Sequence, residues 1–230
     1  MATNKFYTEG IVLSEMKYGD SSKIIRLFTK EKGKISIMAK GAFRAKSALL
    51  SVTQSFALSN YWLRKGQSFY YILSGELISS NFNIRKNYQS LIYASFLSEL
   101  VEKSSLEEMK NEKIFELFNK TMTLLNEEKD PLGLILAFEL KYLTFLGYRP
   151  RLTVGQQNYF SFQEGVLHDE QGQGRPLTSE DVYYLQSLLY TSLDEKLSFD
   201  EKRKSYLHEL FLQYIKYNLE INEFHSLKLI

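Results

Sequence analysis

Residues 10–47 of this chain read GIVLSEMKYGDSSKIIRLFTKEKGKISIMAKGAFRAKS. Apolar and polar residues alternate at 6–18, 22–29 and 33–39, and a period of two residues is typical of half-buried β-strands. The polar link before the third of these segments ends in Gly33 and indicates a hairpin turn. This part of the chain therefore predicts three consecutive strands, the last two joined as a hairpin.

Two further strands are predicted at 56–64 and 69–78, with a turn at 65–67. We expect no helical stretch of any length between the five strands. Five strands in about eighty residues are typical of a small barrel, and a five-stranded barrel of this size fits an OB-fold. OB-folds commonly bind single-stranded nucleic acid, so the pattern also indicates a class of ligand.

From about residue 84 the hydrophobic period changes to the 3.6 residues of an α-helix. The predicted helices cover 88–102, 111–128 and 131–146, and two more begin at residues 178 and 198. Asp130 followed by Pro131 is typical of a helix start, and Gly147 of a helix end. The sequence from Ser198 is a capping-box pattern. The helix at 131–146 is apolar nearly all round, so we expect it at the centre of a bundle.

The predicted fold class is α+β, with an OB-fold domain at 1–80 and an α-helical domain at 81–230 that contains an irregular insertion at about 148–177.

Net charge differs between these two predicted domains. Residues 1–80 hold 12 Lys and Arg against 5 Asp and Glu, a net charge of +7, whereas residues 81–230 have a net charge of −5. A basic β-rich domain joined to a mildly acidic helical one predicts a polyanion-binding module with a second function attached.

Several functional classes lack support in the sequence. The chain has no cysteine, which excludes disulfides, thiol catalysis and thiolate-bound zinc. An 18-residue apolar run and a signal peptide are both absent, so we expect a soluble cytoplasmic protein that does not span a membrane. Glycine-rich nucleotide loops and the HExxH zinc motif are absent as well. We therefore expect no enzymatic activity, no cofactor and no metal.

The cations of the first domain are the candidate contacts to nucleic acid, because phosphates bind Lys and Arg while bases stack on aromatic rings. Residues 40–47 (KGAFRAKS) form a predicted flexible loop with three cations and no acid. An ordinary solvated sheet face is the alternative interpretation, since lysine also protects exposed strand edges. The predicted DNA-binding residues are Lys17, Lys23, Arg26, Lys34, Lys40, Arg44, Lys46, Arg64 and Lys65.

The stretch at 10–47 resembles the N-terminal signature of the RecO family of bacterial recombination mediators. The resemblance continues in order through YASFLSEL at 93–100, FELK at 138–141 and LGY at 146–148, and weakly through HSLK at 225–228. It implies an OB-fold followed by a helical domain, and a non-enzymatic mediator that binds and anneals single- and double-stranded DNA. The family's basic positions correspond here to Lys23, Arg26, Lys34, Lys40, Arg44 and Lys46.

The resemblance also implies protein partners. Family members bind the acidic C-terminal tail of the single-stranded DNA-binding protein SSB, and with RecR they help to load the RecA recombinase onto SSB-coated DNA. For the SSB tail, the predicted docking residues are Phe138, Lys141, Leu146 and Arg149, although Phe138 and Leu146 are more typical of a core.

This chain departs from many relatives at one point. They carry a four-cysteine zinc site after LGY, whereas residues 148–178 here contain no cysteine, so no zinc is expected. The segment then depends on its own apolar residues for packing. The alternative function is an OB-fold adaptor that binds an acidic protein or RNA, because a fold alone does not decide its ligand.

Overall fold

A computed structural model describes residues 4–127, 130–153, 158–169 and 174–229 and divides the chain into two compact units. The first unit comprises residues 1–127 and 225–230, and the second comprises residues 128–224. The helices that directly follow the barrel therefore belong to the same compact unit as the barrel. The predicted division into domains at residue 80 stays a prediction.

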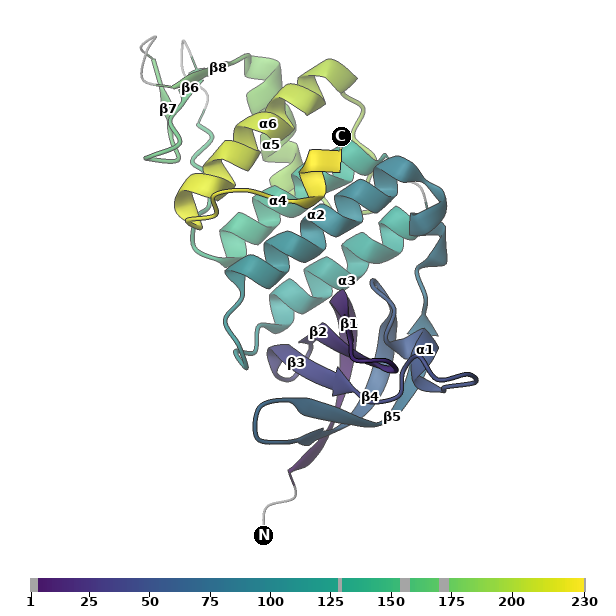
Figure 1. Cartoon of the computed structure of the whole chain (residues 1–230). Coiled ribbons are helices and arrows are strands. Elements are labelled where there is room, and N and C mark those ends of the chain that lie inside the picture. Colours follow the sequence, from purple (N-terminus) through teal and green to yellow (C-terminus); the bar gives the residue numbers. More distant parts are fainter. Residues whose placement is uncertain (1–3, 128–129, 154–157, 170–173, 230) are drawn as a thin grey trace. The chain divides into compact units, whose positions relative to one another are not determined.

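Five strands of the first unit form a closed barrel in the order β1-β2-β3-β5-β4 (Figure 1). They are β1 (Lys5–Tyr18), β2 (Ser22–Thr29), β3 (Gly33–Ala39), β4 (Leu58–Lys65) and β5 (Tyr70–Ser79). Residues 5–11 of β1 pair with β4 and residues 10–18 pair with β2, and the register of the β1–β2 pairing shifts between Val12 and Ser14. A short parallel pairing of β3 with β5 closes the barrel. The predicted five-stranded OB-type barrel and the α+β class are confirmed.

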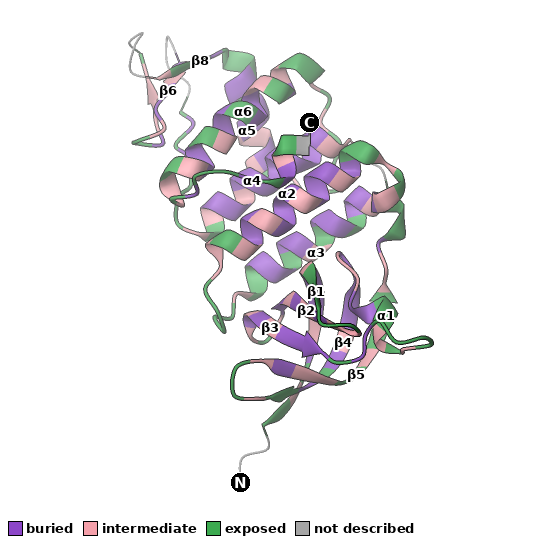
Figure 2. Ribbon diagram, in the orientation of Figure 1, coloured by how far each residue is buried: buried purple, intermediate pink, exposed green. Residues whose placement is uncertain are grey.

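Alternate residues of the strands fill the barrel interior, as the two-residue period predicted (Figure 2). One component of this core was not predicted: α1 (Leu49–Val52), a helix of four residues between β3 and β4. Val52 is buried in the core, and the Tyr61 hydroxyl donates a 2.5 Å hydrogen bond to its carbonyl. Burial raises the pKa of the Tyr61 phenol, which therefore remains a donor. The expectation of no helix between the strands was wrong, because a single turn is too short to show a helical period.

Two helices pack on the barrel within the first unit, after the 3₁₀ turn η1 (Phe82–Lys86). They are α2 (Tyr88–Ser104) and α3 (Glu112–Asn126), and the N-cap of α3 is Asn111, the residue at which the predicted helix begins. Phe28 of β2 lies 6.0 Å and 6.3 Å, between ring centroids, from Phe115 and Phe118 of α3. Gly33, in the turn between β2 and β3, has φ of 64°, and a Cβ added there would lie 2.0 Å from the carbonyl oxygen of Met109. The hairpin thus approaches the α2–α3 connection too closely for any side chain.

The last residues of the chain return to α2 through one carboxylate. The short helix η2 spans Ser226–Leu229, and Glu99 of α2 accepts hydrogen bonds from the backbone N–H groups of His225 and Ser226, each at 2.9 Å. The Ser226 hydroxyl donates a third at 2.7 Å, and Lys103 pairs with the same carboxylate. Burial opposes ionisation here, but the hydrogen bonds from Lys103, Ser226 and His225 outweigh it and lower the pKa of Glu99 to about 2.

The second unit is built around α4 (Pro131–Phe145), which packs against α5 (Ser179–Tyr190) and α6 (Glu201–Asn218). Most residues of α4 are buried, which confirms the predicted central helix (Figure 2). Asp130 caps α4, and Thr178 caps α5 through a capping box with Asp181. The predicted capping box at Ser198 was wrong: the N-cap of α6 is Asp200, whose side chain accepts a hydrogen bond from the Arg203 N–H.

The predicted insertion between α4 and α5 contains a small three-stranded sheet in the order β7-β6-β8. Its strands are β6 (Asn158–Phe160), β7 (Leu167–His168) and β8 (Arg175–Leu177). Phe160 is buried and lies 5.5 Å and 5.2 Å, between ring centroids, from Phe211 and Tyr214 of α6. The described part of this segment therefore packs against α6 through aromatic rings. Residues 154–157 and 170–173 of the predicted insertion lie outside the described residues.

Replacing Glu99→Gln should lower the free energy of unfolding at pH 7 by about 2 kcal/mol, because hydrogen bonds to a charged group contribute about 1.5–3 kcal/mol. The folded-state pKa of Glu99 lies below its ordinary value of 4.5, so its contribution is complete above that pH and declines as pH falls from 4.5 towards about 2. Urea unfolding at pH 7 and pH 3 tests both points. Wild type should lose more stability between these pH values than the variant, and equal losses would contradict the assignment.

Candidate nucleic-acid interface

The predicted DNA-binding cations fall into three groups in the structure: one is buried, three are held by nearby acceptors, and five are exposed. On β2 and β3, side chains point alternately into the barrel and away from it, and this decides which strand cations are buried. Ile25 and Leu27 point inward and Arg26 outward on β2, while Lys34 and Ser36 point outward on β3. A cation is therefore available to a ligand only if it lies on the outward set and is not already paired.

Lys23 belongs to the inward set of β2 and is only 2% exposed. Its ammonium forms an ion pair with Glu15, donates a 3.4 Å hydrogen bond to the Thr53 carbonyl, and lies 4.7 Å from the ring centroid of Phe43. Its inclusion among the DNA contacts needs correction, because the position is on the buried side of the strand. Lys23 stabilises the barrel wall rather than presenting a free charge.

Three other predicted cations are paired with the connection between α2 and α3. We call residues 102–116 the acidic segment, because five of its residues are glutamates. The contacts join Arg26 to Glu102 at 3.7 Å and Glu107 at 3.1 Å, Lys34 to the Glu102 carbonyl oxygen at 2.6 Å, and Lys65 to Glu108 at 2.7 Å. Lys30, outside the predicted set, pairs with Glu112 and Glu116 of the same segment.

The remaining predicted cations are exposed, and within the described parts of the chain no carboxylate forms an ion pair with them. They are Lys17, Lys40, Arg44, Lys46 and Arg64. Lys40 and Arg44 line a cavity of about 430 Å³, here called the Tyr71 hollow. Its lining residues are Tyr18, Ser22, Met38, Lys40, Gly41, Arg44 and Tyr71.

Tyr71 is the centre of this arrangement because two cations face its ring. The Lys40 Nζ lies 5.2 Å, and the Arg64 Cζ 5.8 Å, from the ring centroid. The parallel pairing that closes the barrel sets Met38 of β3 opposite Tyr71 of β5. A cation–π contact leaves the N–H donors of Lys and Arg available to an anion. The hollow thus combines positive charge with an aromatic surface.

Residues 40–47, predicted as a flexible loop, are folded into turns against the start of β2. The Phe43 N–H donates to the Ser21 carbonyl at 2.9 Å, and the Gly41 N–H donates to the Ser22 hydroxyl at 3.2 Å. Gly41 has φ of 72°, a conformation that favours glycine. These bonds fix the backbone on either side of Ala42 and so place Arg44 at the hollow.

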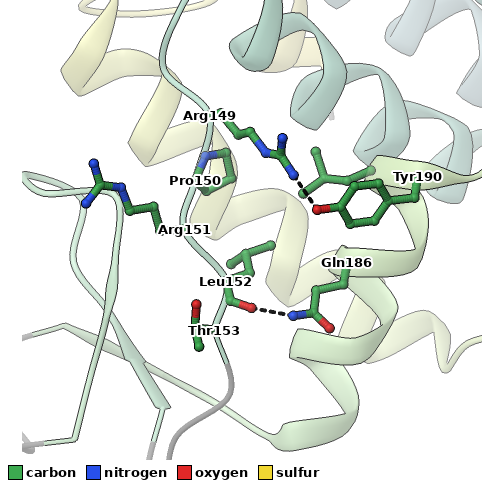
Figure 3. A pocket seen from close by; sticks show the side chains of 8 residues that line it. Arg149, Pro150, Arg151, Leu152, Thr153, Gln186 and Tyr190 are labelled. Carbon is green, nitrogen blue, oxygen red and sulfur yellow. Dashed lines mark hydrogen bonds between the residues drawn. The ribbon is translucent and has the colours of Figure 1, made fainter.

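The second unit carries a separate cavity of about 510 Å³ (Figure 3). We call it the Arg149 cavity, and its lining residues are Arg149, Pro150, Arg151, Leu152, Thr153, Gln186, Leu189 and Tyr190. The Arg149 guanidinium donates to the Tyr190 hydroxyl, and Gln186 of α5 donates to the Leu152 carbonyl, as Figure 3 shows. Two arginines beside apolar surface suit an acidic peptide with an apolar end.

The residues predicted to dock the SSB tail occupy different positions. Phe138 is fully buried and stacked on Tyr142, with 5.2 Å between ring centroids, so its assignment to docking is corrected to core. Lys141 donates to the carbonyls of Leu189 at 2.9 Å and Thr191 at 2.8 Å, and so holds the C-terminal end of α5 beside the cavity. Leu146 is half-buried at the end of α4. Arg149 alone of the four lines the cavity.

Sequence reasoning missed Arg151, Gln186 and Tyr190, which line the Arg149 cavity together with Arg149. The irregular segment after α4 shows no period that would place Arg151, and α5 follows more than 25 residues later. Among the residues that the structure describes, no three His, Asp or Glu side chains gather as a metal ion would require. In the same residues, every helix is too short or too polar to cross a bilayer.

Comparison with known proteins covers both parts of the chain. The family model of the recombination protein O N-terminal domain matches residues 1–81, and that of its C-terminal domain matches residues 85–228. The DNA repair protein RecO of Alkaliphilus metalliredigens is 37% identical over 96% of this chain and 97% of its own length. That of Acetivibrio thermocellus is 35% identical over 69% of this chain and 67% of its own length.

Lys23→Ala should lower the free energy of unfolding by about 2 kcal/mol, because it leaves the partly buried Glu15 without its cation. Lys40→Ala should change it by less than about 1 kcal/mol, since Lys40 is exposed, forms no ion pair within the described residues, and loses only an exposed cation–π contact with Tyr71. Urea unfolding of both variants at neutral pH measures the difference. If the two substitutions had equal and small effects, the internal position of Lys23 would be refuted.

Proposed function

This chain belongs to the RecO family of DNA repair proteins, and from that membership we propose that it is a non-enzymatic, DNA-binding mediator of recombinational repair. It binds and anneals DNA strands and, with RecR, helps to load a RecA-type recombinase on SSB-coated single-stranded DNA. The observation that supports this most directly is the Tyr71 hollow, where unpaired cations lie beside an aromatic ring on an OB-type barrel. We expect it to act in the cytoplasm, where a bacterial chromosome lies.

The proposed mechanism is electrostatic. Exposed cations replace the counterions condensed on DNA, and the release of those counterions drives binding without regard to sequence. The same contacts serve single and double strands, because both present phosphates. Neutralising phosphates on two strands at once reduces their repulsion, which favours annealing. No step of this mechanism breaks or forms a covalent bond, so it requires neither a catalytic residue nor a cofactor.

For the SSB tail we propose the Arg149 cavity of the second unit. Arg149 and Arg151 supply charge for the acidic residues of the tail, and Leu189 and Pro150 supply apolar surface for its end. Lys141 contributes indirectly, by holding the end of α5 that carries Leu189 and Tyr190. DNA and the tail are then bound by different units of the chain, and neither ligand has to displace the other.

In the alternative function, the same barrel is an adaptor that binds an acidic protein or RNA instead of DNA. It predicts that heteropolymer single-stranded DNA does not bind at low salt. A titration of labelled single-stranded DNA therefore separates the two proposals directly, and absence of binding would favour the adaptor.

Replacing Lys40, Arg44 and Lys46 together by Ala should weaken binding of single-stranded DNA by at least about tenfold. If each of the five exposed cations meets one phosphate, log K should fall with log[salt] with a slope of about −3.5, and the triple variant should show about −1.4. Fluorescence anisotropy of a labelled oligonucleotide over a range of salt concentrations measures both quantities.

The matched control for this experiment is the variant Arg26→Ala, Lys30→Ala, Lys65→Ala. It removes the same positive charge from the same barrel, but from cations that the acidic segment already pairs. It should keep most of the affinity and most of the salt slope. An equal loss in both triple variants would show that net charge, rather than the Tyr71 hollow, determines binding.

The double variant Arg149→Ala, Arg151→Ala should weaken binding of an SSB-tail peptide by about tenfold while DNA affinity stays unchanged, because both arginines lie outside the barrel. Anisotropy of the labelled peptide measures the first quantity and that of labelled DNA the second. Lys202→Ala, Lys216→Ala, which removes the same charge from α6, is the control. Wild-type peptide affinity in the arginine variant would exclude the cavity as the docking site.

A further inference from the structure

Tyr7 and Trp62 form an exposed pair of rings on the outside of the barrel. They lie directly opposite each other on β1 and β4, with 5.5 Å between ring centroids and 56° between ring planes. Their exposed fractions are 49% and 50%, and Trp62 is the only tryptophan of the chain. Large rings placed side by side in solvent form a concentrated apolar surface, and such a surface is commonly a binding site.

The neighbouring row of the sheet is cationic. Lys5 lies opposite Arg64 in the same β1–β4 pairing, and both are exposed. Arg64 and Trp62 are two residues apart on β4, as Lys5 and Tyr7 are on β1, so all four side chains lie on the outer face. Arg64 in turn lies opposite Tyr71 of β5. The ring pair is therefore continuous with the Tyr71 hollow through a row of cations.

The row on the other side of the ring pair is different. It consists of Glu9, Asn60 and Glu76, which lie opposite one another on β1, β4 and β5. The carboxylates of Glu9 and Glu76 in this row repel the phosphates of a nucleic-acid backbone. A polyanion crossing this face is consequently confined to the side of the rings where Lys5, Arg64 and Lys40 lie.

Rings beside a line of cations match the chemistry of an unpaired nucleic-acid strand. Its phosphates bind the cations while its bases stack on the rings, and stacking tolerates any base because each has an aromatic face. The bases of a duplex are already stacked on one another and cannot use such a surface. An acidic protein would use the cations equally but would gain no stacking.

We propose that Tyr7 and Trp62 are a base-stacking platform for single-stranded nucleic acid. The platform extends the surface of cations and rings that begins at the Tyr71 hollow. This inference rests on the proposed DNA-binding function and adds to it a preference for single strands over duplex. The phosphate contacts provide affinity for both forms of DNA, and the ring pair distinguishes between them.

The position of the single tryptophan allows a direct test on the full chain. Oligothymidine, which has no competing secondary structure, is titrated into the protein while the emission of Trp62 is followed, and its duplex with oligoadenosine is titrated in parallel. Single strands should quench the emission, and the duplex should leave it nearly unchanged at equal occupancy measured by anisotropy.

Tyr7→Ala and Trp62→Ala should each weaken oligothymidine binding by about tenfold, because stacking on one ring contributes that much to affinity. The salt slope and the duplex affinity should not change, since no phosphate contact is lost. Trp62→Phe should retain most of the affinity. Tyr183→Ala, which removes a 60% exposed ring from α5, is the control and should bind as wild type does.

The outcomes separate this inference from the proposal on which it depends. Normal binding of single strands without quenching, and without loss in the two alanine variants, would refute the platform and leave DNA binding at the Tyr71 hollow intact. Equal weakening of single strands and duplex would also refute it, because a stacking surface discriminates between them. If wild type bound no DNA at low salt, the proposed function itself would fail.

Discussion

The ion pairs of Arg26, Lys30 and Lys65 with the acidic segment link the barrel to the α2–α3 connection and to the start of α3. Each pair is partly exposed, so each contributes only about 0–1 kcal/mol to stability. Their larger effect is on the electrostatic potential, because they cancel positive charge on the side of the barrel that they cover. The acidic segment can approach the barrel this closely because residue 33 is glycine. A side chain at this position would overlap the Met109 carbonyl oxygen. Within the described residues, Lys40, Arg44 and Arg64 lie at the Tyr71 ring or hollow and form no ion pair, and the proposed phosphate site is there.

The chain carries two cation-lined hollows, one in each compact unit, and we propose a different anionic ligand for each. The barrel surface is an open arrangement of cations and rings, which suits an extended polymer. The Arg149 cavity is lined by the segment after α4 and by α5, and we propose it for the end of a peptide (Figure 3). When two ligands belong to one assembly, binding of the first raises the effective concentration of the second. The proposed function therefore assigns SSB and the DNA that SSB covers to different units of the chain, and it requires no chemical step.

Most of the fold could be predicted from local patterns. The period-two alternation located all five barrel strands to within about two residues, and Asn111, Asp130 and Thr178 are helix caps where their side chains indicated. The errors occur where local signals are weak or in competition. The helix α1 is one turn long, and both Ser198 and Asp200 could cap α6, of which the structure selects Asp200.

The sequence by itself determined that the first eighty residues are basic, that they form strands, and which residues share a strand face, because charge and alternation are properties of neighbouring residues. It could not determine which cations remain free, since the partners of Arg26 and Lys65 follow some 40 to 80 residues later in the chain. The same holds for Tyr7 and Trp62, which become neighbours only when β4 pairs with β1. Availability of a charge or a ring depends on what packs against it, and that is decided by tertiary structure.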